Sequence, residues 1–538
     1  MPLENTKDAL PVFILGNAIM TPDVVQKLTD GPGAPLQLPM AEFQRLQSLE
    51  FGRKAPLLHS GGAWLTFHDG EVTYLNKDKL WKPGVTRMPF TDQGSARTRA
   101  DALLGNHQLL SITADPDVDF AFERIAGTRV AIFDAVTGLR LPSTDNKPYF
   151  EIDQQVCYAL HVKAIDPDTG TAIRLPVLGR GTTGRVIVGP GGEVFGLYYG
   201  IRLVAGRLDS LRVIPAEESF AVYRQLLGHR EIRNPRTYLA YKRVDDDGGA
   251  LWPVWVHRAD ARLENDWSAL KEVALTAVKG LGVPETVSGP PSDDPPLEDV
   301  GPGPGVLAAA YWMTGVARSS DLNATRFLSE LQGKGLRVAM ARGGRDAVVT
   351  DWNSVPDQPV DNVNIVFYSG HADQRRILLR DPVSGGDRYF LKTTPVTFGN
   401  QGAQSLDWVV ISACGPMQDR ALPADAINGA PDVFGWRGLF KGLHMLLGHG
   451  TEVGDSPEEG ELFAQLCLAG HSVAEAWFIT SIQLAGGRLQ TWPGILYPRM
   501  ANDEGTLQNR LWGFAPAGTP IVEPPQSPEQ FVAVWVPA

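Results

Sequence analysis

The sequence predicts an α/β domain with a doubly wound, mostly parallel sheet at the carboxy-terminal end, preceded by an α+β, β-rich amino-terminal part. Two observations predict this. From about residue 306 onward, apolar runs alternate with amphipathic helical stretches, which is typical of a parallel sheet covered on both faces. Before residue 287, apolar runs are joined by short turns containing Gly and Asp, which is typical of hairpins. Between the two parts, residues 287–305 are rich in Pro, Gly and Asp and are predicted to form an exposed linker.

Composition and charge restrict the class of protein. The 538 residues allow roughly two to four domains of ~100–200 residues each. The net charge of -12 and the isoelectric point near 5.4 argue against nucleic acid or an anionic membrane as the main partner. No apolar run reaches the ~18 residues of a membrane-spanning helix, and the amino terminus has no recognisable secretory signal. We therefore expect a cytoplasmic protein without a membrane partner.

The three cysteines, Cys157, Cys414 and Cys467, are too few for a disulfide framework in so long a chain, which favours a reducing compartment. A structural zinc site takes about four Cys or His ligands at tight spacing, and no segment of the sequence supplies such a cluster. We therefore expect neither a metal nor an organic cofactor. Cys157 and Cys467 lie in apolar stretches and are predicted to be buried core residues.

The amino-terminal part divides into two stretches. Residues 1–95 carry no pattern that assigns them a class. Residues 96–286 are predicted to form one or more β-rich α+β modules, with hairpins at 131–142 and 163–176 and a helix by period at 266–280. The hairpins, followed by the helical stretch "AEESFAVYRQLL", resemble the small α+β modules that occur as pro-domains or inhibitory domains before bacterial peptidases.

The carboxy-terminal part is predicted to contain a domain over residues 306–500. Its expected strands are "VLAAAYWMTGV", "LRVAMARGG", "NIVFYSGH", "DWVVISACG" and "KGLHMLLGHG". Its expected helices are "SDLNATRFLSELQGKG", "SPEEGELFAQLCLAG" and "HSVAEAWFITSIQLAGG", and the last begins with a capping box formed by Ser472 and Glu475. Residues 501–538 are predicted to be an extension that ends in a strand with no assigned partner.

A histidine and a cysteine stand where two of these strands stop. His371 ends "NIVFYSGH", and Cys414 lies just after the apolar run "DWVVIS". The two residues are 43 positions apart, which leaves room for a crossover between neighbouring strands. Ligands of such sheets bind at the carboxyl ends of the strands. A nearby imidazole can activate a thiol as a nucleophile, and the main-chain N–H groups of Gly370, Ala372 and Cys414 are candidate donors to an oxyanion.

The two blocks Ser369–His371 and Ser412–Gly415 resemble those of the caspase-like cysteine peptidases, which include caspases, legumain, gingipains, clostripain and separase. The resemblance covers about residues 306–487 and is greatest to an uncharacterised bacterial family with SGH and SACG blocks. It implies a caspase-like sheet, with Cys414 as the nucleophile and His371 as the general base and acid. The chain departs from the usual pattern in having Ala372 where these families have glycine after the histidine.

Three functions stay open at this stage. The first is a cysteine endopeptidase that acts on a protein or peptide through an acyl-enzyme, made as a zymogen with residues 96–286 as a pro-domain. The second is a catalytically impaired interaction protein, favoured by Ala372. The third is acyl transfer to an amine by the same dyad. Asp361 and Asp373 are candidates to orient the imidazole or to line a specificity pocket; cleavage preference and oligomeric state are not assigned.

Overall fold

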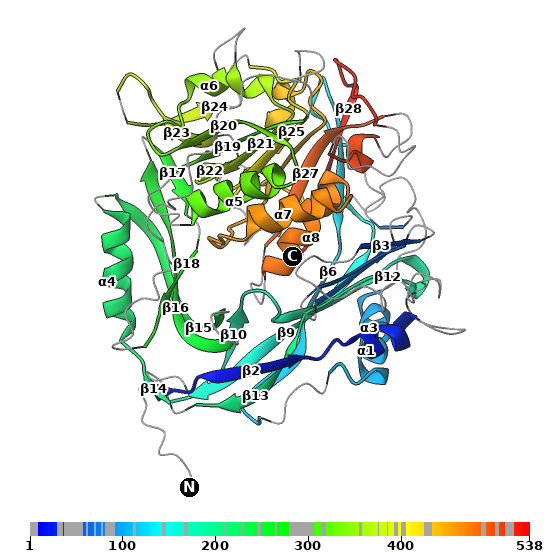
Figure 1. The fold of residues 1–538 in the computed structure, drawn as a ribbon, viewed down its shortest axis with the longest axis vertical. Helices are drawn as coiled ribbons and strands as arrows, with labels where there is room; N and C mark the ends of the chain where they lie inside the picture. Colours follow the sequence, from blue (N-terminus) through cyan, green and yellow to red (C-terminus); the bar gives the residue numbers. More distant parts are fainter. Residues whose placement is uncertain are drawn as a thin grey trace.

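The computed structural model describes residues 9–29, 36, 57–60, 63–68, 71–76, 79–80, 92–110, 115–141, 147–165, 170–208, 210–228, 230–244, 249–263, 266–270, 272–278, 306–313, 319–353, 358–374, 376–384, 386–391, 396–399, 405–423, 433–485, 491–500, 505–511 and 521–538. The predicted linker, 287–305, and much of the stretch 1–95 lie outside these residues. The predicted mixed α/β class is confirmed, and strands predominate (Figure 1).

The carboxy-terminal part is built on a nine-stranded sheet of the described residues. Its strands, in spatial order, are β20 (Arg337–Gly343), β19 (Leu307–Trp312), β21 (Ile365–Ser369), β25 (Trp408–Ser412), β26 (Met445–His449), β27 (Pro493–Pro498), β28 (Gln530–Trp535), β7 (Arg129–Asp134) and β8 (Phe150–Glu151). The pairs from β20 to β26 are parallel, and those from β26 to β8 are antiparallel. The sheet is therefore mixed and not mostly parallel as predicted: one half is parallel and contains the five strands expected from the apolar runs, and the other half is antiparallel.

Three strands of this sheet come from outside residues 306–500. β28 belongs to the predicted extension, and its strand partner is now clear, because it pairs with β27 on one side and with β7 on the other. β7 and β8 come from the amino-terminal part, about 400 residues earlier in the chain by the ranges given above. The sheet thus joins the two parts of the sequence.

Alternating side chains of the parallel strands enter two cores. In β21, Ile365 and Phe367 face one core and Val366 and Tyr368 face the other. The helix-side core is formed with α5 (Ser320–Gln332), α7 (Glu459–Leu468) and α8 (Val473–Ala485). The capping box at the start of α8 is confirmed, because Ser472 and Glu475 exchange hydrogen bonds of 3.0 and 3.2 Å.

The module-side core lies on the opposite face of the parallel strands. The carboxy-terminal part contributes Trp352 on the short helix α6 (Thr350–Asn353) and Trp436 on the 3-10 segment Val433–Leu439. The amino-terminal part contributes Tyr223 on α4 (Ala216–Leu227) and apolar residues of β16 and β18. In Figure 1, α4, β16 and β18 stand at the left, below this end of the sheet.

The amino-terminal part forms a fourteen-stranded sheet in the described residues. Its path is β13 (Arg202–Arg207), β2 (Phe13–Ala18), β16 (Ala250–Leu263), β15 (Ile232–Val244), β10 (Ala172–Leu178), β9 (Gln154–Ile165), β11 (Thr183–Val188), β12 (Val194–Tyr199), β5 (Glu71–Asn76), β4 (Ala63–His68) and β3 (Leu57–Ser60). Off this path, β17 (Asp266–Ala269) and β18 (Val273–Thr276) pair with β16, and β6 (Val118–Ala126) pairs with β9. The hairpins expected from the Gly- and Asp-containing turns are present, as in β9–β10 and β15–β16.

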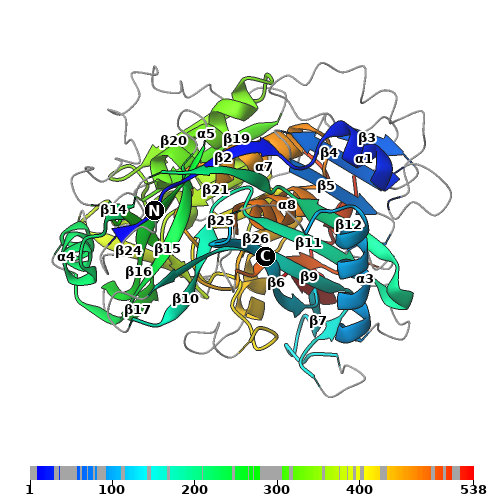
Figure 2. The same cartoon turned by 90° about the horizontal axis from the view of Figure 1, so that it is seen from below.

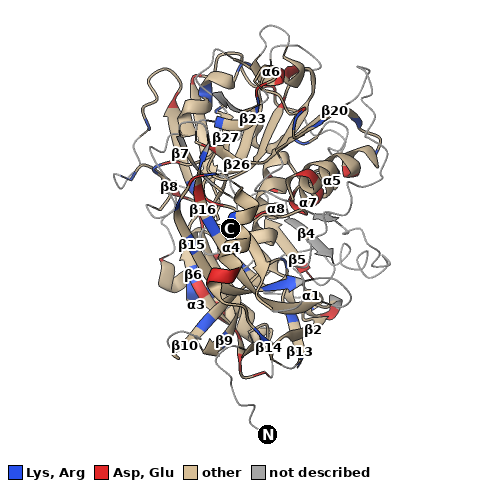
Figure 3. Cartoon of the chain, turned by 90° about the vertical axis from the view of Figure 1, so that its left-hand side faces the viewer, with Lys and Arg blue, Asp and Glu red and all other residues tan. Residues whose placement is uncertain are grey.

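The remaining elements are small. The helix α3 (Gln93–Asn106) packs against β9 and β11, as Figure 2 shows from below. The others are α1 (Pro22–Thr29), the paired strands β1 (Ala9–Leu10) and β14 (Leu211–Arg212), and the small sheet of β22 (Ala372–Asp373), β23 (Arg376–Arg380) and β24 (Asp387–Leu391). Acidic and basic residues are interspersed over the ribbon (Figure 3). Among the helices of the described residues, none has the length and apolar character needed to cross a membrane.

The helix predicted for residues 266–280 is wrong, because this segment forms the strands β17 and β18. Both strands pair with the long strand β16, with Asp266 opposite Leu263 and Val273 opposite His257. The apolar residues Val273 and Leu275 are buried against the module-side core. Pairing with a neighbouring strand overrides the helical period of the local sequence.

Candidate active site

His371 and Cys414 lie just beyond the carboxyl ends of two adjacent parallel strands, β21 and β25. The register sets Ser369 opposite Ser412, so each reactive residue follows a paired residue by two positions. A hydrogen bond of 3.3 Å from the Gly370 N–H to the Ser412 carbonyl continues the pairing one residue further. Because neighbouring strands lie about 4.8 Å apart, the topology brings the imidazole and the thiol to the same edge of the sheet.

The thiol of Cys414 lies against the loop that follows β26. The Val453 N–H is 3.4 Å from the Cys414 sulfur, and the Val453 carbonyl oxygen is 3.8 Å from it. A main-chain N–H beside the sulfur favours the thiolate form. The turn after the cysteine depends on Gly415, which has a φ of 77° and donates its N–H to the Thr451 carbonyl at 3.1 Å. Cys414 is 1% exposed.

The main chain of His371 is held by Tyr368, which lies three residues earlier in β21. The Tyr368 hydroxyl accepts the His371 N–H at 3.2 Å and donates to the Leu378 carbonyl at 2.7 Å. The Leu378 N–H in turn donates to the His371 carbonyl at 2.9 Å. These bonds tie the histidine to β23, and its side chain is 3% exposed.

The structure gives Gly370 a different task from the one predicted. Its N–H is committed to the Ser412 carbonyl, so it contributes to sheet pairing and is not placed as an oxyanion donor. A glycine is needed here because a Cβ at this position would lie 2.5 Å from the hydroxyl oxygen of Tyr368.

Ala372 is compatible with its position in the turn. It begins β22, where it pairs with Ile377. Among the described residues, the non-glycine residues with positive φ are Gln108 and Asn234. Ala372 therefore has an ordinary extended backbone, and the residue after the histidine does not need the freedom of glycine.

The two candidate acidic residues lie in different places. Asp373 forms a close ion pair with Arg376 across the β22–β23 turn, with an O···N distance of 2.6 Å, two residues beyond His371. Asp361 precedes β21 and accepts the Gly399 N–H at 2.7 Å. It lies before the start of β21, whereas His371 follows the other end of this five-residue strand, which is about 16 Å long at ~3.3 Å per residue. This placement does not support an orienting role for Asp361.

A buried amide below the site joins the two strands. The Asn323 amide nitrogen, on α5, donates to the hydroxyls of Ser369 and Ser412 at 3.1 and 3.0 Å. Its oxygen accepts the Gly460 N–H at 2.5 Å, at the start of α7. Because the two serines are the paired residues that precede His371 and Cys414, this amide helps to fix the positions of the two residues relative to one another along the strand direction.

A buried carboxylate completes the network. Glu459 accepts hydrogen bonds from the Ser412 hydroxyl and, at 2.8 Å, interacts with Nε2 of His449, the last residue of β26. The His449 ring packs on Trp477, with 4.8 Å between the ring centroids. All three strand ends at the site edge are therefore held by one polar network.

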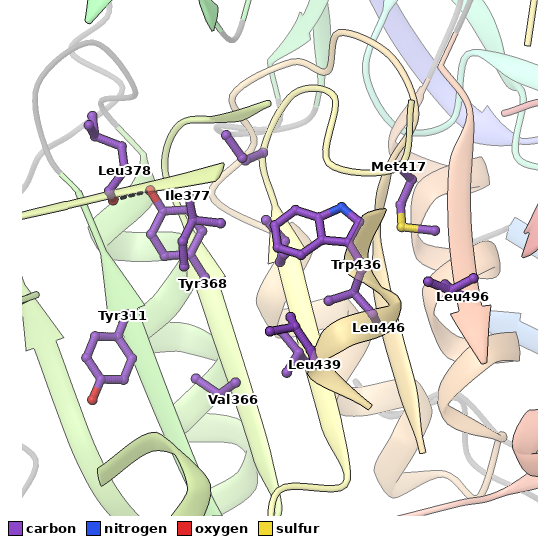
Figure 4. Close-up of a cluster of buried hydrophobic side chains, with 14 of the residues drawn as sticks. Tyr311, Val366, Tyr368, Ile377, Leu378, Met417, Trp436, Leu439, Leu446 and Leu496 are labelled. Carbon is purple, nitrogen blue, oxygen red and sulfur yellow. Dashed lines mark hydrogen bonds between the residues drawn. The ribbon is translucent and has the colours of Figure 1, made fainter. Parts of the chain in front are cut away.

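Indole groups support the chain that follows Cys414. Trp436 donates to the Pro416 carbonyl at 2.7 Å, and Trp535 of β28 donates to the Met417 carbonyl at 2.8 Å. Figure 4 shows Trp436 and Met417 beside one another in the module-side core, with Tyr368 bonded to the Leu378 main chain nearby.

The sequence reading missed the loop after β26 and the buried Asn323. The loop could have been found from "LLGHGT", because β26 is a third apolar run that ends on small residues at the same sheet edge. Its Glu452 forms an ion pair of 2.5 Å with Arg258 of β16, and burial raises the pKa of the Glu452 carboxyl while Arg258 opposes that shift. Among the described residues, no group of three or more Cys, His, Asp and Glu is placed to hold a metal ion.

Comparison with known proteins places the site within a recognised domain. Residues 311–535 match a family described as "Domain of unknown function (DUF6345)". This range contains His371, Cys414 and the loop after β26, and it excludes α4 and β16–β18. No curated protein matches the chain.

Two solved structures align with parts of the chain. One is an uncharacterized protein from Eubacterium rectale ATCC 33656, with 10% identity over 51% of this chain and 84% of that chain and a TM-score of 0.25. The other is the Bacillus megaterium YpeB C-terminal domain, with 10% identity over 46% of this chain and 95% of that chain and a TM-score of 0.18. Scores this low carry no inference about fold or function.

Proposed function

We propose that the carboxy-terminal part is a cysteine peptidase of the caspase-like kind, with Cys414 as the nucleophile and His371 as the general base and acid. The observation that carries the proposal is the register: both residues follow the paired Ser369 and Ser412 by two positions on adjacent parallel strands. Thiol-dependent acyl transfer requires a base within reach of the thiol, and the placement of both residues at the ends of adjacent parallel strands supports this pairing.

The proposed reaction needs only groups at this edge. The Cys414 thiol passes its proton to His371, and the sulfur attacks the carbonyl carbon of a peptide bond. The imidazolium returns that proton to the leaving amine as the carbon–nitrogen bond breaks, which leaves a thioester. Water then gives a proton to His371 and attacks the thioester, and the thiol is regenerated as the acid product leaves. The Val453 N–H beside the sulfur supports the thiolate stage.

The test is the pH dependence of iodoacetamide alkylation of each cysteine, read by peptide mass mapping of the full chain. We expect Cys414 to titrate with an apparent pKa below the ~8.5 of a free thiol, and we expect His371→Ala to move that pKa upward. His107→Ala is the matched control, because His107 lies after α3, in the amino-terminal part. An unchanged Cys414 profile in His371→Ala would contradict the proposal.

Turnover is tested separately with a peptide library and the Cys414→Ala variant. Cleavage by the wild type that is absent from Cys414→Ala supports hydrolysis. Products extended by an added amine indicate that the same dyad transfers the acyl group to an amine.

A second candidate is an interaction protein built on the same scaffold. It is favoured by the burial of both reactive residues, of which 1% and 3% are exposed. This candidate predicts that Cys414 is alkylated no faster than the core residue Cys467 at any pH, and that His371→Ala changes nothing.

A further inference from the structure

The Cys414 site is covered by a segment of the amino-terminal part. Where β17 gives way to β18, four residue steps from Ala269 to Val273 face only three steps of β16, from Asp260 to His257. The stretch between β17 and β18 therefore has one residue more than the stretch of β16 that it faces. Glu272 lies in this junction and is buried.

Glu272 pairs instead with the loop after β26. It forms a parallel bridge with Gly454. Its N–H donates to the Val453 carbonyl at 3.1 Å, and its carbonyl accepts the Asp455 N–H at 3.2 Å. Val453 therefore has Glu272 on its carbonyl side and the Cys414 sulfur beside its N–H, at 3.4 Å. A single residue, Val453, therefore lies between Glu272 and the Cys414 sulfur.

The same segment also reaches the histidine side of the site. β17 packs against β22, which starts directly after His371. Figure 1 shows β17 beside β22 at the left of the carboxy-terminal sheet. The segment that contains β17 and Glu272 thus extends from the His371 strand end to the Cys414 loop.

Side chains reinforce this cover. Arg258 of β16 forms an ion pair of 2.5 Å with Glu452, the residue before Val453. Tyr223 of α4 is fully buried in the module-side core, which also contains Ala372 and Ala413, the neighbours of the two reactive residues. Burial raises the pKa of the Tyr223 hydroxyl, and Cys414 and Glu452 add to the increase, which agrees with a position close to the thiol.

We propose that the main chain at Glu272 is a built-in inhibitory segment, which occupies the edge at Val453–Asp455 where an extended peptide would pair beside Cys414. This inference rests on the peptidase function proposed above. Extended peptides are commonly bound by main-chain pairing with an exposed edge, and Glu272 satisfies the edge in the same way. The covering residues lie outside the matched range 311–535, so the cover is an addition to that domain. Opening of the β17–β18 junction would convert the latent site into an accessible one.

The test compares two substitutions of Glu272 in the full chain. Glu272→Pro removes the N–H that donates to Val453, whereas Glu272→Ala keeps it and removes only the carboxylate. The measurement is the rate of iodoacetamide alkylation of Cys414 at constant pH. We expect an increase of at least tenfold in Glu272→Pro and less than threefold in Glu272→Ala. Cys157 and Cys467, both buried, are internal controls that stay protected if the fold is intact.

Each outcome has a defined meaning. An unchanged Cys414 rate in Glu272→Pro, with Cys157 and Cys467 protected, overturns the proposal. An equal increase in Glu272→Ala assigns the cover to the carboxylate and overturns the main-chain version. The double variant Glu272→Pro with His371→Ala separates the two proposals. If its Cys414 alkylation rate is as fast as in Glu272→Pro alone, Glu272 covers the thiol but His371 does not activate it, which contradicts only the peptidase function.

A second pair of substitutions keeps the test decisive if Glu272→Pro unfolds, which labelling of all three cysteines would reveal. Glu272→Cys with Gly454→Cys places two thiols on bridge partners, whose Cα atoms are about 5 Å apart in a parallel pair, within the span of a disulfide. We expect oxidation to lower the Cys414 rate at least fivefold below wild type and reduction to restore it. A Cys414 rate that is indifferent to this disulfide overturns the proposal.

Discussion

Replacing Asn323 by alanine removes the side chain that bonds to the last residues of β21 and β25, next to the candidate dyad. Asn323 donates to Ser369 at 3.1 Å and to Ser412 at 3.0 Å, and it accepts the Gly460 N–H at 2.5 Å. Each of the two bonds that Asn323 donates contributes a net ~1 kcal/mol, and loss of the bond from Gly460 leaves a buried N–H with a desolvation penalty of ~1–3 kcal/mol. We therefore expect Asn323→Ala to lose about 3–5 kcal/mol of the free energy of unfolding of the carboxy-terminal sheet.

Cys467 provides a local assay for this loss. It is fully buried on α7, in the helix-side core, so pulse labelling of its thiol during a urea titration reports the unfolding of this unit alone. Thr325→Ala on the same helix is the matched control, because it removes only bonds from the Thr325 hydroxyl to carbonyls one turn earlier and should cost less than ~0.5 kcal/mol. A loss below about 1 kcal/mol in Asn323→Ala, or one equal to the control, would refute the assignment of Asn323 as the bridge between the strands.

Three further substitutions test other parts of the structure by urea unfolding. Burial raises the pKa of Asp153 to about 6, so its carboxylate costs roughly 3 kcal/mol of folding stability above pH 6 and nothing below its ordinary pKa. Asp153→Asn should therefore be roughly 1–3 kcal/mol more stable than wild type at pH 7.5 and equally stable at pH 3.5. A loss of stability in this variant at pH 7.5 contradicts the prediction. Burial lowers the pKa of His257 to about 4, so the free energy of unfolding of the wild type should fall by roughly 2–3 kcal/mol between pH 6.5 and pH 4. His257→Gln should lack this decline. Parallel pH profiles of stability in the two proteins would show that His257 does not cause it. Gly415→Ala should cost about 1–2 kcal/mol because its φ is 77°, while Gly438→Ala, where a Cβ meets nothing within 4 Å, should cost little.

The strands that carry the site could be predicted because their signal is local. The runs Ile365–Ser369 and Trp408–Ser412 are apolar throughout and fully buried, and each stops on small residues. The position of His371 and Cys414 at one sheet edge follows from the parallel topology that these runs imply. The Asn323 amide that bonds both Ser369 and Ser412 could not be predicted, because nothing in the local sequence of α5 distinguishes this asparagine from a solvent-facing one.

Features decided by distant pairing could not be predicted. β28 was expected to be a strand, but its partner β7 lies about 400 residues away, and pairing between distant segments leaves no local pattern. The segment 266–280 has a helical period, yet β16 offers it an edge with complementary apolar residues. The local sequence of Glu272 resembles that of a surface carboxylate, and its main chain pairs with the loop after β26 only because the fold brings the two segments together.

Because β7 and β28 belong to one sheet, the order of synthesis determines when this sheet can assemble. The covering elements α4, β16 and β17 leave the ribosome before β21, β25 and β26, and the strand β28 that joins β27 to β7 leaves after all of them. Pairing of such distant segments is slow, because loop closure must precede the contacts that reward it. The segment around Glu272, proposed above to be inhibitory, is therefore synthesised before Cys414, and the nine-stranded sheet is complete only after β28 has been synthesised. Under this proposal, the candidate site is not assembled before the segment that covers it has been synthesised.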